Sequence, residues 1–409
     1  MLHPHRRTVV RLVLVLGAMV ALLAAIGGTI RALGAREEAA VDPSAVEGLS
    51  PSWTADLQQG PVTGLAFESG RLYVSTGQGL SVFDPACEDP QGSRCRPSWL
   101  GVVPDGPLSA PVVSAERVYA GSASGQVYAF PATCDAGGCS PQWVGIAGNG
   151  TVSRPGVNDD FVYVTSDRLY AFPAACGSAD RPCPSTWSTS LERRATGDAP
   201  AVGGGVVVVS SGSVEGGVSA FPAVCTNRCE PLWTAETNGP ATGVSIEGDT
   251  AYVVARGRLL AFPLSCRDTC RPSWTGTFAP GGGYAAGSAW PPAVGDGQVA
   301  IAGQDGTLWL FPASCDRSTC EPLRSVDLDP TGSSAPSIEG GIVYLMSADA
   351  RLFAVPMVCD RGSPACARPP STPVGSSNPA VPASGGGSVY AGDDAGIVHA
   401  YTLRTSGAP

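Results

Sequence analysis

Fourteen cysteines are the residues of this 409-residue sequence with the most chemical potential, and they occur as seven close pairs. Within a pair the two cysteines are four to eight positions apart. Such pairs can form disulfides, act as reactive thiols or bind a zinc ion. The pairs are Cys87 with Cys95, Cys134 with Cys139, Cys176 with Cys183, Cys225 with Cys229, Cys266 with Cys270, Cys315 with Cys320, and Cys359 with Cys366.

The N-terminal segment determines the redox environment of these thiols. Residues 12–30 form an uncharged apolar run, close to the ~20 residues that a bilayer-spanning helix needs. Arginines at 6, 7 and 11 precede this run, which places residues 1–11 in the cytoplasm and the rest outside. We therefore expect a single-pass signal anchor in the cell membrane, followed by a linker over residues 31–51. A cleavable signal peptide is the alternative, and it would also export the rest of the chain.

Export and regular pairing favour disulfides over the other two kinds of site. An even number of cysteines beyond an oxidising boundary is typical of a disulfide framework. The separation within pairs varies, no histidine accompanies them, and a zinc site with four thiolates would need two distant pairs to converge. We expect all seven pairs to be disulfides, with reactive or metal-binding thiols as the alternatives.

The cysteine pairs mark a tandem repeat with a period of about 45 residues. Each copy carries an aromatic run such as VYAFP before the first cysteine, and most copies carry a tryptophan after the second. The unit that opens at Trp99 contains four short runs of β-branched and aromatic residues, at 99–103, 109–115, 117–123 and 125–132. Short strands separated by Gly, Pro, Ser and Asp at this period predict propeller blades.

The repeat predicts an all-β fold, an eight-bladed β-propeller of four-stranded antiparallel blades over residues 52–405. Seven blades, with the two ends of the chain sharing one, are the alternative. We expect each cysteine pair to lie between the last strand of one blade and the first strand of the next. The tryptophan that follows should pack between adjacent blades. The expected blade openings are Trp53, Trp99, Trp143, Trp187, Trp233, Trp274, Leu323 and the stretch after Cys366.

The unit from Val112 to Trp143, VVSAERVYAGSASGQVYAF with its closing tryptophan, resembles the pyrroloquinoline-quinone-like repeat of eight-bladed propellers. The hairpin recurs at 303–311 and 392–401, so the resemblance extends from about residue 53 to residue 403. It implies the propeller fold and brings in quinone-dependent dehydrogenases and an outer-membrane assembly lipoprotein as functional candidates. The dehydrogenases carry adjacent cysteines, and some carry a CxxCH haem motif; this sequence has neither. The lipoprotein needs a cysteine directly after its signal segment, whereas the first cysteine here is Cys87.

Other candidate residues have ordinary structural interpretations beside the functional ones. His399 is the one histidine after the apolar segment, and it occupies the place that Tyr128 holds in its own repeat, which favours a partly buried strand residue. The acidic runs could bind calcium, but Asp is also the usual residue of tight turns. Residues 278–292 depart most from the repeat, so Tyr284 and Trp290 are the expected recognition loop, with a long hairpin as the alternative. The acidic runs are Asp159-Asp160, Asp393-Asp394, and Asp327 with Asp329.

Composition excludes several classes of function. The net charge is −10 and all 25 basic residues are arginine, which argues against nucleic-acid binding and removes lysine chemistry. We expect a membrane-anchored extracytoplasmic binding or scaffold module for proteins or cell-envelope material, without catalysis, cofactor or metal. A pyrroloquinoline-quinone-dependent oxidoreductase that also uses calcium, and a glycan-binding propeller, are the alternatives.

Overall fold

The chain divides into two compact units, Met1–Val41 and Asp42–Pro409. The computed structural model describes residues 43–87, 94–134, 137–177, 181–191, 199–226, 229–278, 290–328, 334–359, 366, 368–376 and 380–405. The expected anchor therefore lies outside the described residues. In the described part, strands follow a single 3-10 helix, η1 (Pro43–Ala45). No helix of this part is both long and apolar enough to cross a bilayer.

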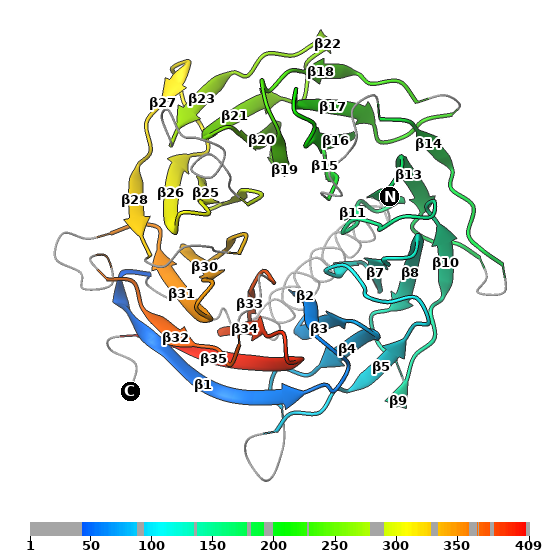
Figure 1. Cartoon of the computed structure of the whole chain (residues 1–409), viewed down its shortest axis with the longest axis vertical. Coiled ribbons are helices and arrows are strands. Elements are labelled where there is room, and N and C mark those ends of the chain that lie inside the picture. The colour runs from blue at the N-terminus through cyan, green and yellow to red at the C-terminus, as the bar shows by residue number, and fades with distance from the viewer. Residues whose placement is uncertain are drawn as a thin grey trace, which may run out of the picture. The chain divides into compact units, whose positions relative to one another are not determined.

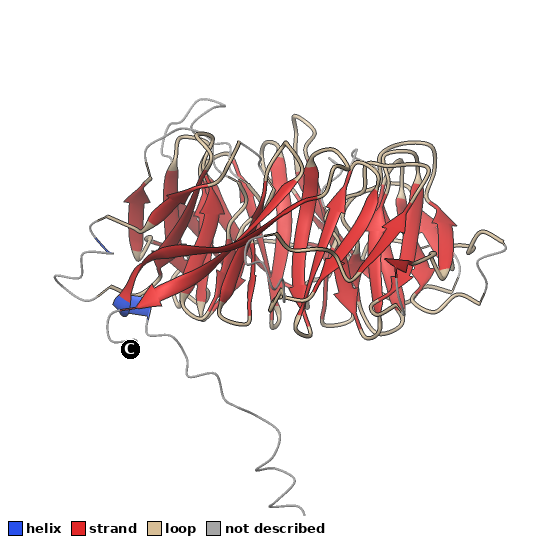
Figure 2. Cartoon of the chain, turned by 90° about the horizontal axis from the view of Figure 1, so that it is seen from below, coloured by secondary structure: helices blue, strands red, loops and turns tan. Residues whose placement is uncertain are grey.

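The second unit is a ring of eight blades of antiparallel strands around a central axis (Figure 1). In the side view the strands run between the two flat faces of the ring (Figure 2). The strands of each blade are given from the inner to the outer one. Blade 1 consists of β2 (Val62–Glu68), β3 (Arg71–Thr76), β4 (Gly79–Phe83) and β5 (Trp99–Val102). Blade 2 consists of β6 (Val112–Ser114), β7 (Arg117–Gly121), β8 (Gln126–Pro131) and β10 (Trp143–Ile146). Blade 3 consists of β11 (Gly156–Val157), β12 (Phe161–Thr165), β13 (Leu169–Pro173) and β14 (Trp187–Thr189). Blade 4 consists of β15 (Ala201–Gly203), β16 (Val206–Ser211), β17 (Gly217–Pro222) and β18 (Trp233–Ala235).

The remaining four blades follow the same order. Blade 5 consists of β19 (Ala241–Glu247), β20 (Thr250–Ala255), β21 (Arg258–Pro263) and β23 (Trp274–Thr277). Blade 6 consists of β24 (Ala293–Gly295), β25 (Gln298–Ala302), β26 (Thr307–Pro312) and β28 (Arg324–Asp327). Blade 7 consists of β29 (Ser337–Glu339), β30 (Ile342–Met346), β31 (Arg351–Pro356) and β32 (Ser371–Pro373). Blade 8 consists of β33 (Ala383–Gly385), β34 (Ser388–Gly392), β35 (Ile397–Thr405) and β1 (Val46–Asp56). Eight blades of four antiparallel strands confirm the predicted fold, and the seven-bladed alternative is wrong.

Burial explains why the middle strands are apolar on both faces while the outer strands alternate. Strand β7 and strand β8 lie between two neighbouring blades, and four consecutive residues of each are buried. A sheet covered on both faces requires such continuous apolar runs. The outer strand β10 alternates between buried and exposed residues, because only one of its faces meets a neighbouring blade.

Three of the outer strands, those beginning at Trp99, Trp143 and Trp274, carry a Trp-x-Gly pattern because the glycine faces an aromatic ring of the next blade. A Cβ atom on Gly101 would lie 2.6 Å from the Phe130 ring, and one on Gly145 would lie 2.7 Å from the Phe172 ring. Real Cβ atoms do not approach other atoms so closely, so the phenylalanine of one blade packs on the bare backbone of the preceding outer strand. The tryptophan two positions earlier fills the rest of this interface; Trp143, for example, is fully buried.

The assignment of the tryptophan strand to the next blade is wrong. Trp143 on β10 pairs with Ala129 on β8, and Trp99 on β5 pairs with Val82 on β4. Each tryptophan strand is therefore the outermost strand of the blade that precedes it in the chain. The cysteine pair consequently lies between the third and fourth strands of one blade, and after the tryptophan strand the chain crosses from the rim to the innermost strand of the next blade.

The two ends of the described chain meet in blade 8. Strand β1 pairs with β35 over its whole length, from Val46 opposite Thr405 to Asp56 opposite Ile397. The first strand thus begins at Val46, before the expected start of the propeller at residue 52. Trp53 lies in this strand and packs against Tyr390 of blade 8 and Phe83 of blade 1, so the N-terminal strand closes the ring.

Candidate functional site

All fourteen cysteines form the seven expected disulfides. The Cα atoms within a pair are 5.5 to 6.4 Å apart, an ordinary separation for this bond. The second cysteine is buried in each of the first six pairs, and its backbone binds the preceding blade. The N–H of Cys139 donates to the carbonyl of Leu100 at 2.7 Å, and the N–H of Cys183 donates to that of Val144 at 2.7 Å. The disulfide loop therefore attaches one blade to the outer strand of the blade before it.

Blade 6 carries an arginine at the tryptophan position. Arg324 pairs with Leu310 as Trp143 pairs with Ala129, and it follows the second cysteine by four positions, as the tryptophans do. Its guanidinium donates to the carbonyl of Pro356 at 2.9 Å and to that of Cys366 at 2.6 Å, both in blade 7. Burial lowers the pKa of this group from its ordinary value. The expected blade opening at Leu323 therefore lies one residue too early. The constant spacing of four positions after the second cysteine would have identified Arg324 instead.

Tyrosine hydroxyls on the second strands also connect neighbouring blades. Tyr119 donates to the carbonyl of Ala174 at 3.0 Å, and Tyr163 donates to that of Ala223 at 2.8 Å. The indole N–H of Trp143 shares the Ala174 carbonyl at 3.2 Å. Burial raises the pKa of Tyr163 to about 12, because the phenolate would lose its hydration there.

Those of the remaining residues singled out in the sequence that the structure describes do not assemble into a catalytic group. His399 lies half-buried on β35, and its Nε2 atom is 3.1 Å from Oδ2 of the buried Asp393. Asp159, Asp160 and Asp394 are exposed in turns, and Asp327 is exposed at the end of its strand; Asp329 lies outside the described residues. Within the described ranges, no three side chains of the His, Cys, Asp and Glu types gather as a metal site would require.

The expected recognition loop is only partly described. Tyr284 lies outside the described residues. Trp290 is half-buried against the apolar cluster between blades 6 and 7, and its backbone N–H donates to Ala302 at 3.2 Å. This contact places Trp290 at the entry to blade 6, where its side chain contributes to packing between blades.

Exposed aliphatic side chains mark the rim of blades 1 and 2. Val102 is 67% exposed and Ile146 is 54% exposed, at equivalent positions of β5 and β10, the outer strands of two neighbouring blades (Figure 1). Leu100 and Val144 lie two residues before them on the same outward face, half-buried. We call these four residues the rim patch. The corresponding outward positions of the other tryptophan or arginine strands carry Thr54 and Asp56, Ser188 and Ser190, Thr234 and Glu236, Thr275 and Thr277, and Ser325 and Asp327.

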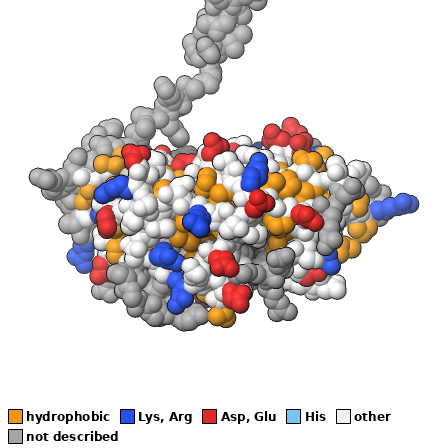
Figure 3. All heavy atoms as spheres, turned by 90° about the horizontal axis from the view of Figure 1, so that it is seen from above, with side chains coloured by type: hydrophobic (Ala, Val, Ile, Leu, Met, Phe, Trp, Pro, Cys, Tyr) orange, Lys and Arg blue, Asp and Glu red, His pale blue; other side chains and the backbone are white. Residues whose placement is uncertain are grey.

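The surface around β18 and β22 (Asp268–Thr269) differs, because acidic and basic side chains are interspersed with apolar ones there (Figure 3). Solvent-facing strands are ordinarily polar in this way, and the rim patch departs from that pattern on two outer strands. The rim patch could not be predicted from the sequence, because it differs from the other repeats only in having apolar residues at two outward positions of the outer strand.

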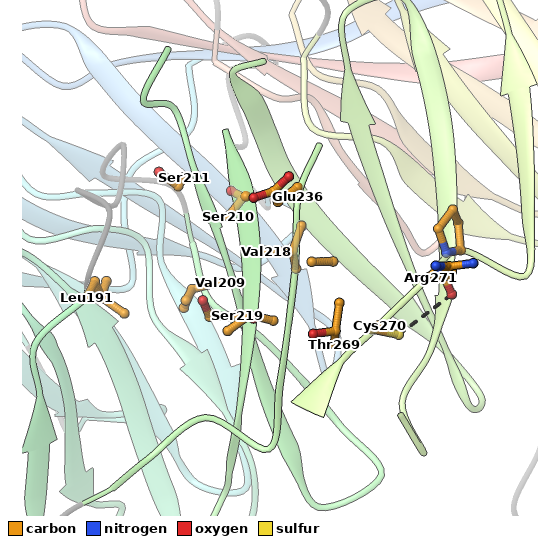
Figure 4. A pocket seen from close by; sticks show the side chains of 14 residues that line it. Leu191, Val209, Ser210, Ser211, Val218, Ser219, Glu236, Thr269, Cys270 and Arg271 are labelled. Carbon is orange, nitrogen blue, oxygen red and sulfur yellow. Dashed lines mark hydrogen bonds between the residues drawn. The ribbon is translucent and has the colours of Figure 1, made fainter. Parts of the chain in front are cut away.

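A cavity with a volume of about 360 Å³ opens beside blade 4 (Figure 4). Its walls include Ser211, Ser219 and Glu236 of blade 4, Leu191 after blade 3, and Arg271, which follows the disulfide loop of blade 5. The volume lies at the lower end of the range for small-molecule sites, ~300–1,000 Å³. The lining mixes hydroxyls, one carboxylate and one guanidinium with aliphatic side chains, so the cavity suits a small polar ligand.

Comparisons with known proteins extend the assignment of the fold. No family model and no curated protein matches the sequence. Three similar solved structures are the computationally designed Ika8 protein (TM-score 0.68, 12% identity, 86% of this chain and 99% of that one), BamB from Moraxella catarrhalis (0.62, 16%, 87% and 99%) and Saccharomyces cerevisiae Sqt1 (0.65, 8%, 88% and 100%). At these identities the likeness concerns the fold alone, and it identifies the second unit of this chain as a β-propeller similar to that of BamB.

Proposed function

We propose that the protein is a membrane-anchored, extracytoplasmic propeller that binds a protein partner through the rim patch and performs no catalysis itself. The observation that carries this proposal is the exposure of Val102 and Ile146 at positions where five other outer strands present polar side chains. Leaving two aliphatic side chains in water gains nothing for folding, whereas burying them against a partner is favourable by roughly 25 cal/mol per Å².

The ring supports a binding role because it holds the patch rigidly. The outer strands β5 and β10 are each attached to the next blade by the backbone N–H of a disulfide-bonded cysteine. A preformed surface loses little conformational entropy on association. The apolar run at residues 12–30 supports the proposed anchor, and seven disulfides support an oxidising location.

Site-specific photocrosslinking in intact cells tests the proposal. A photoreactive amino acid replaces Val102 in one version of the protein and Thr277, the equivalent residue of blade 5, in the matched control. We expect one saturable crosslinked protein from position 102 and none from position 277. Substituting Val102→Asp together with Ile146→Asp should weaken the complex by about tenfold or more, because charges then face an apolar partner surface. Equal crosslinking from both positions would contradict the proposal.

The proposed location has its own test. After cell fractionation, the full-length protein should remain in the membrane pellet on alkaline carbonate washing, and an external protease should degrade the propeller only after the outer permeability barrier is opened. Recovery of the intact chain in the wash supernatant would argue against a retained anchor.

A further inference from the structure

Two Asn-Gly dipeptides occur in the sequence, Asn149-Gly150 and Asn238-Gly239. Both lie in a loop that leads from the outer strand of one blade to the inner strand of the next, the first between β10 and β11 and the second between β18 and β19 (Figure 1). In such a dipeptide the backbone nitrogen of the glycine can attack the side-chain amide carbon of the asparagine. Glycine permits this approach because it has no Cβ atom and adopts a wide range of backbone conformations.

The first dipeptide is open to solvent. Asn149 and Gly150 are both exposed. Hydrogen bonds hold the loop on either side of them, because the N–H groups of Ala147 and Val152 donate to backbone carbonyls of the β7–β8 hairpin at 2.7 Å and 2.9 Å. Between these two bonds, no N–H of residues 148–151 has an acceptor in the described part of the chain. The nitrogen of Gly150 is therefore available to react.

The second dipeptide is protected by the fold. Gly239 is buried, and its N–H donates to the carbonyl of Glu215 at 3.0 Å. The guanidinium of Arg256 donates to the carbonyl of Asn238 at 2.9 Å. The stem of Arg256 covers Gly239, since a Cβ atom on this glycine would lie 2.2 Å from Cδ of the arginine. The nitrogen of Gly239 therefore reacts only when this part of the chain opens locally.

We propose that Asn149 is a site of spontaneous deamidation and that the fold prevents the same reaction at Asn238. The nitrogen of Gly150 forms a bond with Cγ of Asn149, the bond between Cγ and Nδ2 breaks, and ammonia leaves with the proton of the N–H group. The product is a cyclic succinimide. Water then opens the ring at either of its carbonyl groups and yields an aspartate or an isoaspartate, whose main chain continues through the former side chain. Water is the sole co-reactant.

Either product exchanges a neutral amide for a carboxylate on the surface of the protein. The carboxylate lies three positions after Ile146 of the rim patch in the chain. The reaction therefore makes the net charge of the protein more negative at the edge of blade 2, and converted molecules can be separated from unconverted ones by anion exchange.

Incubation of the purified full-length protein at mildly alkaline pH tests the inference. Peptide mass spectrometry follows the conversion at both asparagines in the same sample, so each molecule carries its own control. We expect Asn149 to convert about tenfold faster than Asn238 or more, because the hydrogen bond of Gly239 must break before its nitrogen can react. In guanidinium chloride the two sites should convert at similar rates, since neither nitrogen is then protected.

Two variants complete the design. Gly150→Ala should suppress most of the conversion at Asn149, because the added Cβ atom hinders the attack. The variant should fold, since this Cβ atom would lie 3.4 Å from the hydroxyl of Ser166, an ordinary contact, and the melting temperature checks this. Thr151→Ala is the matched control in the same loop and should leave the rate unchanged.

Three results would overturn the inference. The first is an equal rate of conversion at Asn149 and Asn238 in the folded protein. The second is a folded protein in which Asn149 stays unconverted while the same asparagine converts in guanidinium chloride. The third is an undiminished rate at Asn149 in Gly150→Ala.

Discussion

At the scale of single residues, Arg324 shows that an arginine at the tryptophan position can donate hydrogen bonds to the next blade. Trp143 donates one hydrogen bond to the next blade, at the carbonyl of Ala174. Arg324 donates to two carbonyls of the next blade and also contacts the Sγ atom of Cys359 at 2.5 Å. An arginine can replace the indole because its planar guanidinium presents several N–H donors in a fixed geometry while its stem packs against apolar side chains.

Arg324→Ala should therefore lower the free energy of unfolding by about 2 kcal/mol, because two carbonyls between blades lose a charged donor. Arg324→Trp should recover most of this loss, since it restores the residue of the other blades. Urea unfolding at neutral pH measures both. Arg267→Ala is the matched control, because Arg267 is exposed and, among the described residues, donates to the carbonyls of Ser265 and Cys266 beside it. A similar loss in Arg324→Ala and Arg267→Ala would contradict this interpretation.

At the scale of elements, the sequence predicts the strands better than it predicts their grouping. The runs at 117–123 and 125–132 contain the strands β7 and β8, since apolar runs bounded by turn residues are an unambiguous local signal. The sequence cannot place the run at 99–103 in a blade, because a tandem repeat has the same period wherever its first unit begins. The pairing of Trp99 with Val82 shows which blade this run belongs to. This pairing is a contact between two strands, so no local sequence pattern predicts it.

The blades are also connected by tyrosines whose protonation affects stability. Burial raises the pKa of Tyr163 to about 12, above the ordinary value of 10.0, so the folded state favours the protonated hydroxyl that donates to Ala223. This contribution is complete below pH 10 and is lost as the pH rises towards 12, because the unfolded chain releases the proton first.

We therefore expect the free energy of unfolding to fall steeply between about pH 10 and pH 12. Tyr163→Phe should cost about 1 kcal/mol at neutral pH, since it removes one buried hydrogen bond, and it should reduce the alkaline loss. Urea titrations at a series of pH values measure both effects. If the variant showed the same alkaline loss as the parent protein, Tyr163 would have no part in it.

At the scale of the whole molecule, the sites are visible only as departures from the repeat. The seven disulfides could be predicted because cysteine pairs recur with the period. The rim patch depends on Val102 and Ile146 facing water, and the cavity depends on two small residues, Gly217 and Ser219, on one face of β17. Neither follows from residue type alone, because a valine or a serine in a strand is ordinary until the sheet assigns it to a face.

Closure of the ring is the property that links all eight blades, and strand β1 provides it. This strand supplies the fourth strand of blade 8, the buried Trp53 and the Thr54 carbonyl that accepts the N–H of Cys95 at 2.8 Å. Its removal exposes the edge of β35 and opens the interface between blades 8 and 1, and an open sheet edge favours aggregation.

Deleting residues 43–56 should therefore cost at least about 4 kcal/mol, the typical loss for one buried tryptophan alone, and the protein should aggregate at temperatures where the parent is folded. Thermal unfolding with light scattering measures both. Deletion of residues 406–409, beyond the last pairing of β35 at Thr405, is the control and should leave the melting temperature unchanged. A synthetic peptide of residues 43–57 should restore part of the stability by pairing with β35. If the truncated protein had the same melting temperature as the parent, seven complete blades and one incomplete blade would be sufficient to keep the ring folded without this strand.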